Sequence, residues 1–303
     1  MGSCSKTLMK NKILYLLLIF FSNFLIWSSA NSIEQFNFNV TEVEILNNGN
    51  IVKGLKRGTI NTNDGIFINA DTFEFDKISN KLSASGNVEL IDTVENYVIY
   101  SDNLVYFKDL EKIITKKNSK AIYEKNKVII ADRFEYNKFS NILNAKGNVE
   151  IEDKVKNNII YSNDVTYYKD LEKIITKGKT NAFIQSKYEI KSEDIIFLIN
   201  QQNLSSYKKT EVKDSKSNIY YLNKFNYQIN DELLKGEDVL IVTNFNLPKS
   251  DKFYLKNAII DLKNQNFLAK DTEVKVHKDI FDNSDNDPRL KGVSSMGNND
   301  ITL

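Results

Sequence analysis

The chain has 303 residues, with 41 Lys and Arg against 40 Asp and Glu, so its formal net charge is +1. This balance argues against nucleic acid as a ligand, because no basic excess is available to neutralise phosphates. One histidine and one cysteine leave too few ligands for a His/Cys metal site. The length suits one large domain or two modest ones.

Residues 1–30 have the pattern of a secretion signal. Three lysines precede an apolar run over residues 13–27, and small residues at 28–30 supply a cleavage site. The run is shorter than the roughly 20 residues of a membrane span, which favours a cleaved signal over the alternative, an uncleaved anchor helix. Met9 is an alternative start. Cys4 leaves with the signal, so the mature chain forms no disulfide.

The rest of the chain is internally duplicated. The nonapeptide KDLEKIITK occurs at residues 108–116 and again 61 residues later, and the Gly-Asn-Val-Glu of residues 86–89 returns at 147–150. Weaker copies extend the array over roughly 40–278. Self-similarity at a fixed period indicates stacked supersecondary units, so we expect one repetitive body.

Each repeat contains alternating segments that predict strands. Apolar residues share one parity over 82–90 and again over 143–151, which is typical of strands with one buried face. Asn, Asp and Ser at 76–80 and 137–141 favour turns. The period also splits into halves of about 30 residues, which predicts hairpins. A helix over KDLEKIITK is the alternative, although its Ile-Ile-Thr suits a strand better.

The composition changes after His277. Residues 279–289 are rich in Asp and Asn, with Pro288 near their end, and two glycines follow. We expect a loop or linker over 279–303 without a closing strand, and we interpret Leu303 as the end of a fragment rather than of a natural domain. The acidic stretch lacks the pattern of a 12-residue calcium loop.

The sequence offers no recognisable catalytic machinery. The single His277 has no nucleophile motif nearby, and neither a GxGxxG motif nor a P-loop occurs. Carboxylates alternate with lysines in a manner typical of a solvated strand face. A glycosidase-like carboxylate pair stays open as an alternative. We therefore predict no catalytic residue, no metal site and no cofactor, and a protein that is not an enzyme.

The repeat unit resembles a known family. Residues 71–90 and 132–151 follow the pattern Asp-x-Phe-x-[Phe/Tyr], then Leu-x-Ala-x-Gly-Asn-Val. This pattern resembles the OstA-like repeat of lipopolysaccharide-transport proteins. The resemblance implies an all-β fold: an elongated, open-ended, twisted β-jellyroll of antiparallel OstA-type repeats over residues 31–278, with lipid A acyl chains between its sheets. The inward residues expected to line this acyl-chain slot are Phe73, Phe75, Leu82, Val88, Leu90, Leu104, Tyr106, Phe134, Tyr136, Leu143, Val149 and Ile151.

The resemblance also implies a role, a location and partners. We expect an exported domain in the periplasm, at the inner face of the outer membrane, that receives lipopolysaccharide and delivers it for outer-membrane assembly. The tail at 279–303 resembles the junction where LptD-type members pass into an outer-membrane barrel, and a stand-alone LptA-type bridge is the alternative. The implied partners are lipopolysaccharide, other jellyroll transport proteins that pair by edge strands, and an outer-membrane lipoprotein where a barrel is present. The cysteines that join jellyroll and barrel in some members are absent.

Two other architectures compete with the jellyroll. A secreted structural β-solenoid without a lipid ligand would also show a 61-residue period, and it predicts parallel ladders where a jellyroll predicts antiparallel ones. A transmembrane barrel within these residues is a weaker alternative, because one parity of its strands is dense in Lys, Glu and Asn whereas lipid demands an apolar face.

Overall fold

The computed structural model of the chain describes residues 36–245, 247–281 and 288–297. The signal segment predicted at residues 1–30 lies outside the described residues. Among those described, no helix is both long and apolar enough to cross a membrane.

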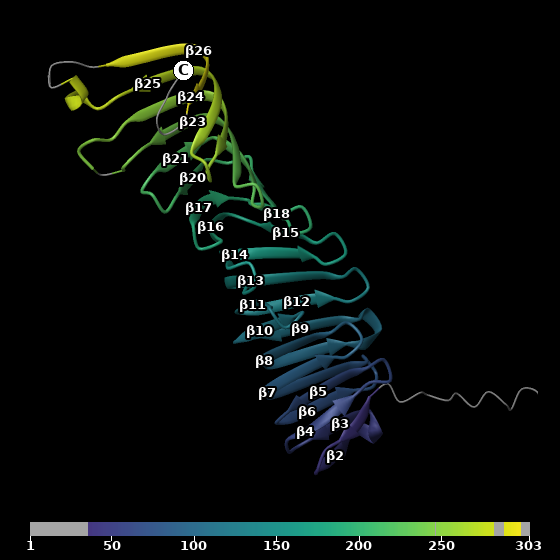
Figure 1. Cartoon of the computed structure of the whole chain (residues 1–303). Coiled ribbons are helices and arrows are strands. Elements are labelled where there is room, and N and C mark those ends of the chain that lie inside the picture. Colours follow the sequence, from purple (N-terminus) through teal and green to yellow (C-terminus); the bar gives the residue numbers. More distant parts are fainter. Residues whose placement is uncertain (1–35, 246, 282–287, 298–303) are drawn as a thin grey trace, which may run out of the picture. The chain divides into compact units, whose positions relative to one another are not determined.

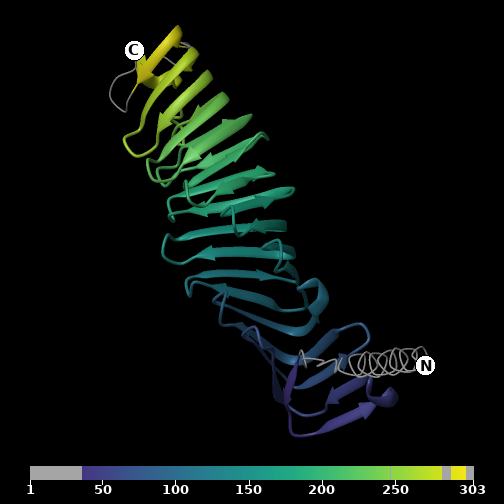
Figure 2. The same ribbon diagram turned by 90° about the vertical axis from the view of Figure 1, so that its right-hand side faces the viewer.

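The chain divides into two compact units, residues 1–37 and 38–303. The second unit is an array of β-strands that succeed one another in chain order from one end to the other (Figures 1 and 2). All its described strand pairs are antiparallel, and they join into one continuous sheet. This is the pattern predicted for a jellyroll and not for a solenoid. The predicted fold, all-β, antiparallel and open-ended, is therefore confirmed.

The sheet folds over into two facing layers. Layer A is built from β2 (Val43–Leu46), β3 (Ile51–Gly54), β6 (Thr72–Asp76), β9 (Lys112–Lys116), β12 (Arg133–Asn137), β15 (Lys173–Thr176), β18 (Ile196–Leu198), β19 (Asn203–Ser206) and β22 (Lys224–Gln228). Layer B is built from β4 (Gly58–Asn61), β5 (Ile66–Ala70), β10 (Ser119–Tyr123), β11 (Lys127–Ala131), β16 (Lys179–Ile184), β17 (Tyr188–Glu193), β20 (Thr210–Lys213) and β21 (Ile219–Leu222).

Long strands belong to both layers and hold them together. They are β7 (Lys81–Asp92), β8 (Tyr97–Phe107), β13 (Ile142–Asp153), β14 (Asn158–Tyr168), β23 (Leu233–Val242), β24 (Lys252–Asp261), β25 (Asn266–Lys275) and β26 (Arg289–Gly297). For example, the first half of β7 pairs with β6 and its second half pairs with β5. The other secondary-structure elements of the described residues are β1 (Asn37–Asn39) and three short 3₁₀ turns, η1 (Asn47–Gly49), η2 (Lys108–Leu110) and η3 (Lys278–Phe281).

A β-bulge lies where β7 passes from one layer to the other. Gly86 and Asn87 stand together opposite a single residue of β8, and both have positive φ, +78° and +46°. A Cβ atom on Gly86 would lie 2.5 Å from the carboxylate of Asp71, so only glycine fits. Because a bulge bends its strand, this residue pair places the crossing between the layers.

A side-chain contact recurs along the edge of the array where the long strands cross from one layer to the other. In each instance an asparagine Nδ2 donates to an aspartate carboxylate 15 or 16 residues away, at distances of 2.8 to 3.1 Å. The pairs are Asp71 with Asn87, Asp102 with Asn118, Asp132 with Asn148, and Asn223 with Asp238. We call this joined edge the spine. The opposite edge, where the turns of the two layers face each other, is called the mouth.

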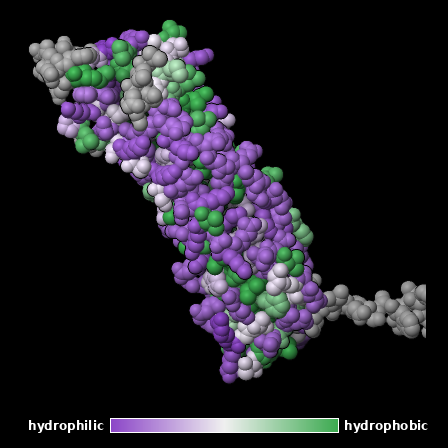
Figure 3. Space-filling model, in the orientation of Figure 1, coloured by the Kyte–Doolittle hydropathy of each residue, from purple (hydrophilic) through white to green (hydrophobic). Residues whose placement is uncertain are grey.

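The core lies between the layers, as the alternation predicted. Leu82, Leu104, Tyr106 and Phe134 are almost completely buried. The outward positions carry charged pairs such as Lys112 with Glu135, whose Nζ and Oε atoms lie 2.6 Å apart. Most of the surface in view is hydrophilic, with hydrophobic residues scattered over it (Figure 3). Burial of the inward apolar row at roughly 25 cal/mol per Å² is the main stabilisation available to a chain without disulfides.

Two sequence predictions need correction. The loop expected over 279–303 is interrupted by β26, which pairs along its length with β25 although its side chains are mostly exposed. Backbone pairing to a preformed strand edge needs no apolar alternation, so residues 289–297 carry no pattern that predicts a strand. The KDLEKIITK segment starts with the short turn η2 and continues as β9, so the alternative of a helix is wrong.

Candidate functional site

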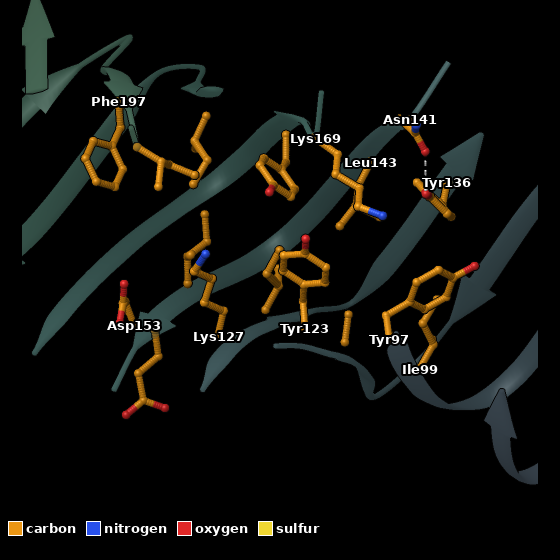
Figure 4. Close-up of a pocket in the computed structure, with 17 residues that line it drawn as sticks. Tyr97, Ile99, Tyr123, Lys127, Tyr136, Asn141, Leu143, Asp153, Lys169 and Phe197 are labelled. Carbon is orange, nitrogen blue, oxygen red and sulfur yellow. Dashed lines mark hydrogen bonds between the residues drawn. The ribbon is translucent and has the colours of Figure 1, made fainter. Parts of the chain in front are cut away.

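An apolar cleft separates the two layers in the middle of the array, at the mouth (Figure 4). Its volume is about 100 Å³, several times the roughly 10–15 Å³ that a cavity needs to hold one water molecule. Layer A and the layer A halves of the long strands contribute Tyr136, Asn141, Leu143, Tyr167, Lys169, Ile174, Phe197 and Ile199. Layer B and the layer B halves contribute Tyr97, Ile99, Ala121, Tyr123, Lys127, Ile129, Ile151, Glu152 and Asp153.

Tyrosines close one side of the cleft. The rings of Tyr97 and Tyr136 meet edge to face across the layers, with centroids 5.5 Å apart. The Tyr136 hydroxyl donates to the Oδ1 of Asn141 at 2.9 Å, which fixes the ring against the turn after β12. Burial raises the pKa of Tyr136 and of Tyr167 well above the usual value, so both phenols stay neutral and present uncharged rings to the cleft.

The rim of the cleft is charged. Lys169, from the turn after β14, pairs with Glu95 of the opposite layer, and its Nζ lies 5.3 Å from the ring centroid of Tyr123. Lys127 pairs with Glu124 at 2.7 Å, and its Nζ lies over the same ring. Each lysine therefore places its charged Nζ at the mouth, over the face of the same aromatic ring. The cleft combines an apolar floor with a polar entrance.

The twelve predicted slot residues all belong to the inward row. Eleven of them are buried, and the remaining one, Ile151, is half-buried. Only Tyr136, Leu143 and Ile151 line the cleft; the others fill the core on either side of it. Contact of these residues with acyl chains stays a prediction.

Sequence reasoning missed most of the cleft. Tyr97, Tyr123, Tyr167 and Phe197 line it but were not selected. Tyr167 is the counterpart of the predicted Tyr106 one period later, so the same alternation would have found it. The inward parity of β8 changes between Ser101 and Leu104, so the parity of Leu104 and Tyr106 does not lead to Tyr97. Across the mouth, β10 faces β15 and β18. This arrangement depends on the whole fold, and no local sequence pattern predicts it.

The side chains that line this site do not form a cluster of metal ligands. Within the described ranges, no group of three or more His, Cys, Asp or Glu side chains is arranged to hold a metal ion. His277 is half-buried, and its Nδ1 lies 2.8 Å from Asp251. This contact ties the segment after β25 to the start of β24.

The fold and the cleft define a two-layered antiparallel β protein with an apolar interior. No family model matches the sequence, and no curated protein matches it. Among solved structures the chain is similar to LptH from Pseudomonas aeruginosa, described as the LptA-homologous periplasmic component of a lipopolysaccharide transport device. The match has 14% identity and a TM-score of 0.33, and it covers 37% of this chain and 82% of that one. A likeness of this strength does not bear on function, and the fold assignment rests on the strand pairing itself.

Proposed function

We propose that the protein binds lipopolysaccharide through its acyl chains, between layers A and B, as a non-enzymatic transport component of the periplasm. The observation that carries the proposal is the apolar cleft, which opens at the mouth under a charged rim. Each methylene transferred from water into such a cleft is worth about 0.8 kcal/mol. The polar part of an amphiphile can stay in water at the rim while its chains enter.

The cleft as it stands admits only a short stretch of one chain. Longer chains require the half-buried rings of Tyr123 and Tyr167 to turn aside. Such a movement stays local, because both rings lie at the mouth and not in the densely packed core at the spine. Binding therefore widens the cleft from the mouth inward.

The ends of the array supply the surface for partners. At one end Val43 and Ile45 of β2 are exposed, and at the other Leu290 and Val293 of β26 are exposed. An exposed edge strand is a template for strand addition. We propose that other jellyroll transport proteins pair there, and that lipopolysaccharide passes along the joined interiors. An LptD-type protein, whose barrel and lipoprotein partner lie beyond these residues, fits this arrangement, and so does an LptA-type bridge.

A photoreactive amino acid tests the binding site. Placed at Leu143 or Ile151, it is expected to capture purified lipopolysaccharide. The matched positions Glu135 and Glu150 lie on the same layers but on the outward parity, and they are expected to capture little. Equal capture at inward and outward positions, or none at either, would overturn the proposal.

A further inference from the structure

The two copies of the duplicated sequence differ in how tightly their interiors are closed. In the first copy Ile68 and Leu90 have no exposed surface. Their counterparts 61 residues later, Ile129 and Ile151, are half-buried and line the cleft. The backbone pairing is the same in both copies, since β5 pairs with β7 as β11 pairs with β13. The difference must therefore come from side chains.

A cluster of charges closes the mouth of the first copy. Lys108 contacts Asp64 at 2.8 Å and also pairs with Glu111, while Lys138 contacts Asp92 at 3.0 Å. Both lysines and Glu111 come from turns of layer A, and both aspartates come from layer B. The Asp92 side chain has no exposed surface, so this pair is shielded from water. We call these five residues the clasp.

The second copy lacks the residues that a clasp needs. The position equivalent to Lys138 is Ile199, and the position equivalent to Asp64 is Lys125. One substitution removes a cation from layer A, and the other reverses the charge in layer B. Asp153, the counterpart of Asp92, lines the cleft, and so does Ile199. The change from Lys to Ile also adds an apolar side chain to the lining.

Single contacts across the mouth mark the limits of this open stretch. On one side Lys169 pairs with Glu95. On the other, Glu232 of layer A accepts hydrogen bonds from Lys187 at 2.6 Å and from the Tyr188 hydroxyl, both of layer B. Within the described residues, no ion pair joins the turns of the two layers between these contacts.

We propose that the second copy is a lateral port, through which an acyl chain enters sideways, and that the clasp keeps the first copy shut. This inference rests on the proposed function in taking acyl chains as the guest. It adds that Lys138, Asp64, Ile199 and Lys125 decide which part of the interior admits them. A guest that moves from the port toward the N-terminal strands must first open the clasp.

Exchanging residues between the copies tests the port. A closing variant, Ile199→Lys with Lys125→Asp, builds a clasp in the second copy. An opening variant, Lys138→Ile with Asp64→Lys, removes it from the first. Each is prepared in a Cys4→Ser background with one cysteine, either at Leu90 or at Ile151. The rate of reaction with a maleimide reports access, and labelling of the same position by a diazirine-bearing palmitic acid reports entry of an acyl chain.

In the unexchanged protein, the thiol at 151 is expected to react at least about ten-fold faster than the thiol at 90, because reaction at 90 requires local opening. The closing variant slows reaction at 151, the opening variant accelerates it at 90, and fatty-acid labelling follows the same order. Equal rates at the two positions, or rates that neither exchange alters in variants with unchanged circular dichroism, would overturn the port. Maleimide rates in the expected order without lipid labelling at any position would show that the exchanged residues control access to the interior, but would contradict acyl chains as the guest and with them the proposed function.

Discussion

Gly147 shows how one residue can fix the path of a strand. Its φ is +75°, and a Cβ atom there would lie 2.2 Å from the Asp132 carboxylate. Gly178 has a similar φ of +77° but open space around it. Left-handed backbone costs a residue with a Cβ about 1 kcal/mol. We therefore expect Gly178→Ala to lower the free energy of unfolding in urea by about 1 kcal/mol and Gly147→Ala by about 2–3 kcal/mol. Equal losses would contradict the close approach.

Lys138 is the residue on which the clasp depends most. Its replacement by alanine leaves the carboxylate of Asp92 buried without its cation, which costs about 3 kcal/mol in comparable pairs. Lys146 pairs with Asp164 at 3.6 Å on the exposed face, where an ion pair is worth less than about 1 kcal/mol. Urea unfolding of Lys138→Ala and Lys146→Ala is expected to show this difference. A similar, small loss in both variants would mean that water reaches the clasp.

At the scale of elements, the clasp makes the contact between layers depend on pH. Burial alone would raise the pKa of Asp64, but hydrogen bonds from Lys108 and Thr62 and the nearby charge of Lys108 outweigh it and lower the pKa below 3.8. Burial lowers the pKa of Lys108, yet Asp64 and Glu111 raise it above 10.5. The stabilisation that Asp64 gives to the folded state is therefore present above the pKa of Asp64 in the unfolded chain, and it is lost as the pH falls through the lower pKa of the folded state. The Lys108 contribution is present below pH 10.5 and lost as pH rises through the folded value.

Thermal unfolding at a series of pH values checks this expectation. The unfolding temperature is expected to fall below about pH 4, and the fall should be shallower in Asp64→Asn, which lacks the titrating group. Other carboxylates with lowered pKa, such as Asp76 and Glu135, titrate equally in both proteins, so the difference between the two curves isolates Asp64. Superimposable curves would show that the clasp contributes nothing to acid stability.

The strands could be predicted from sequence, but the crossing between layers could not. Alternation over 82–90 and 143–151 gave the correct buried parity. Gly86 and Asn87 form a bulge that keeps this parity while turning the strand into the other layer. The alternation therefore predicts one straight strand, although the two halves of β7 lie in different layers. The Asp/Asn pairs of the spine, at a spacing of 15 or 16 residues, were a signal in the sequence that went unused.

The candidate site was predicted only in part for a related reason. Parity identifies inward residues such as Leu82 and Leu143, which are equivalent in the two copies. It does not show which of them are shielded from solvent at the mouth, because this shielding depends on charged side chains from the turns of the opposite layer. Lys138 and Ile199 look like unrelated loop residues until the fold places both at the mouth.

At the scale of the molecule, both end strands expose apolar side chains. We expect the protein to associate end to end as its concentration rises, by pairing between β2 and β26 of neighbouring copies. Charges on an edge strand oppose such pairing. Val43→Lys with Ile45→Lys should therefore yield monomers in analytical ultracentrifugation, whereas the same change at Ile78 and Val94, exposed in turns, should not. Association unaffected by the β2 variant would place the contact elsewhere.

The central claim is that acyl chains enter between the layers, and quenching by brominated chains tests it most directly. Trp27 is the only tryptophan of the chain, so a Trp27→Phe background leaves the emission to one introduced reporter. A tryptophan in place of Tyr123 lies in the cleft, and one in place of Tyr100 lies on the outer face of the same layer. Brominated acyl chains are predicted to quench the reporter at 123 and to leave the reporter at 100 unchanged. Equal quenching at both positions, or none at 123, would contradict the account.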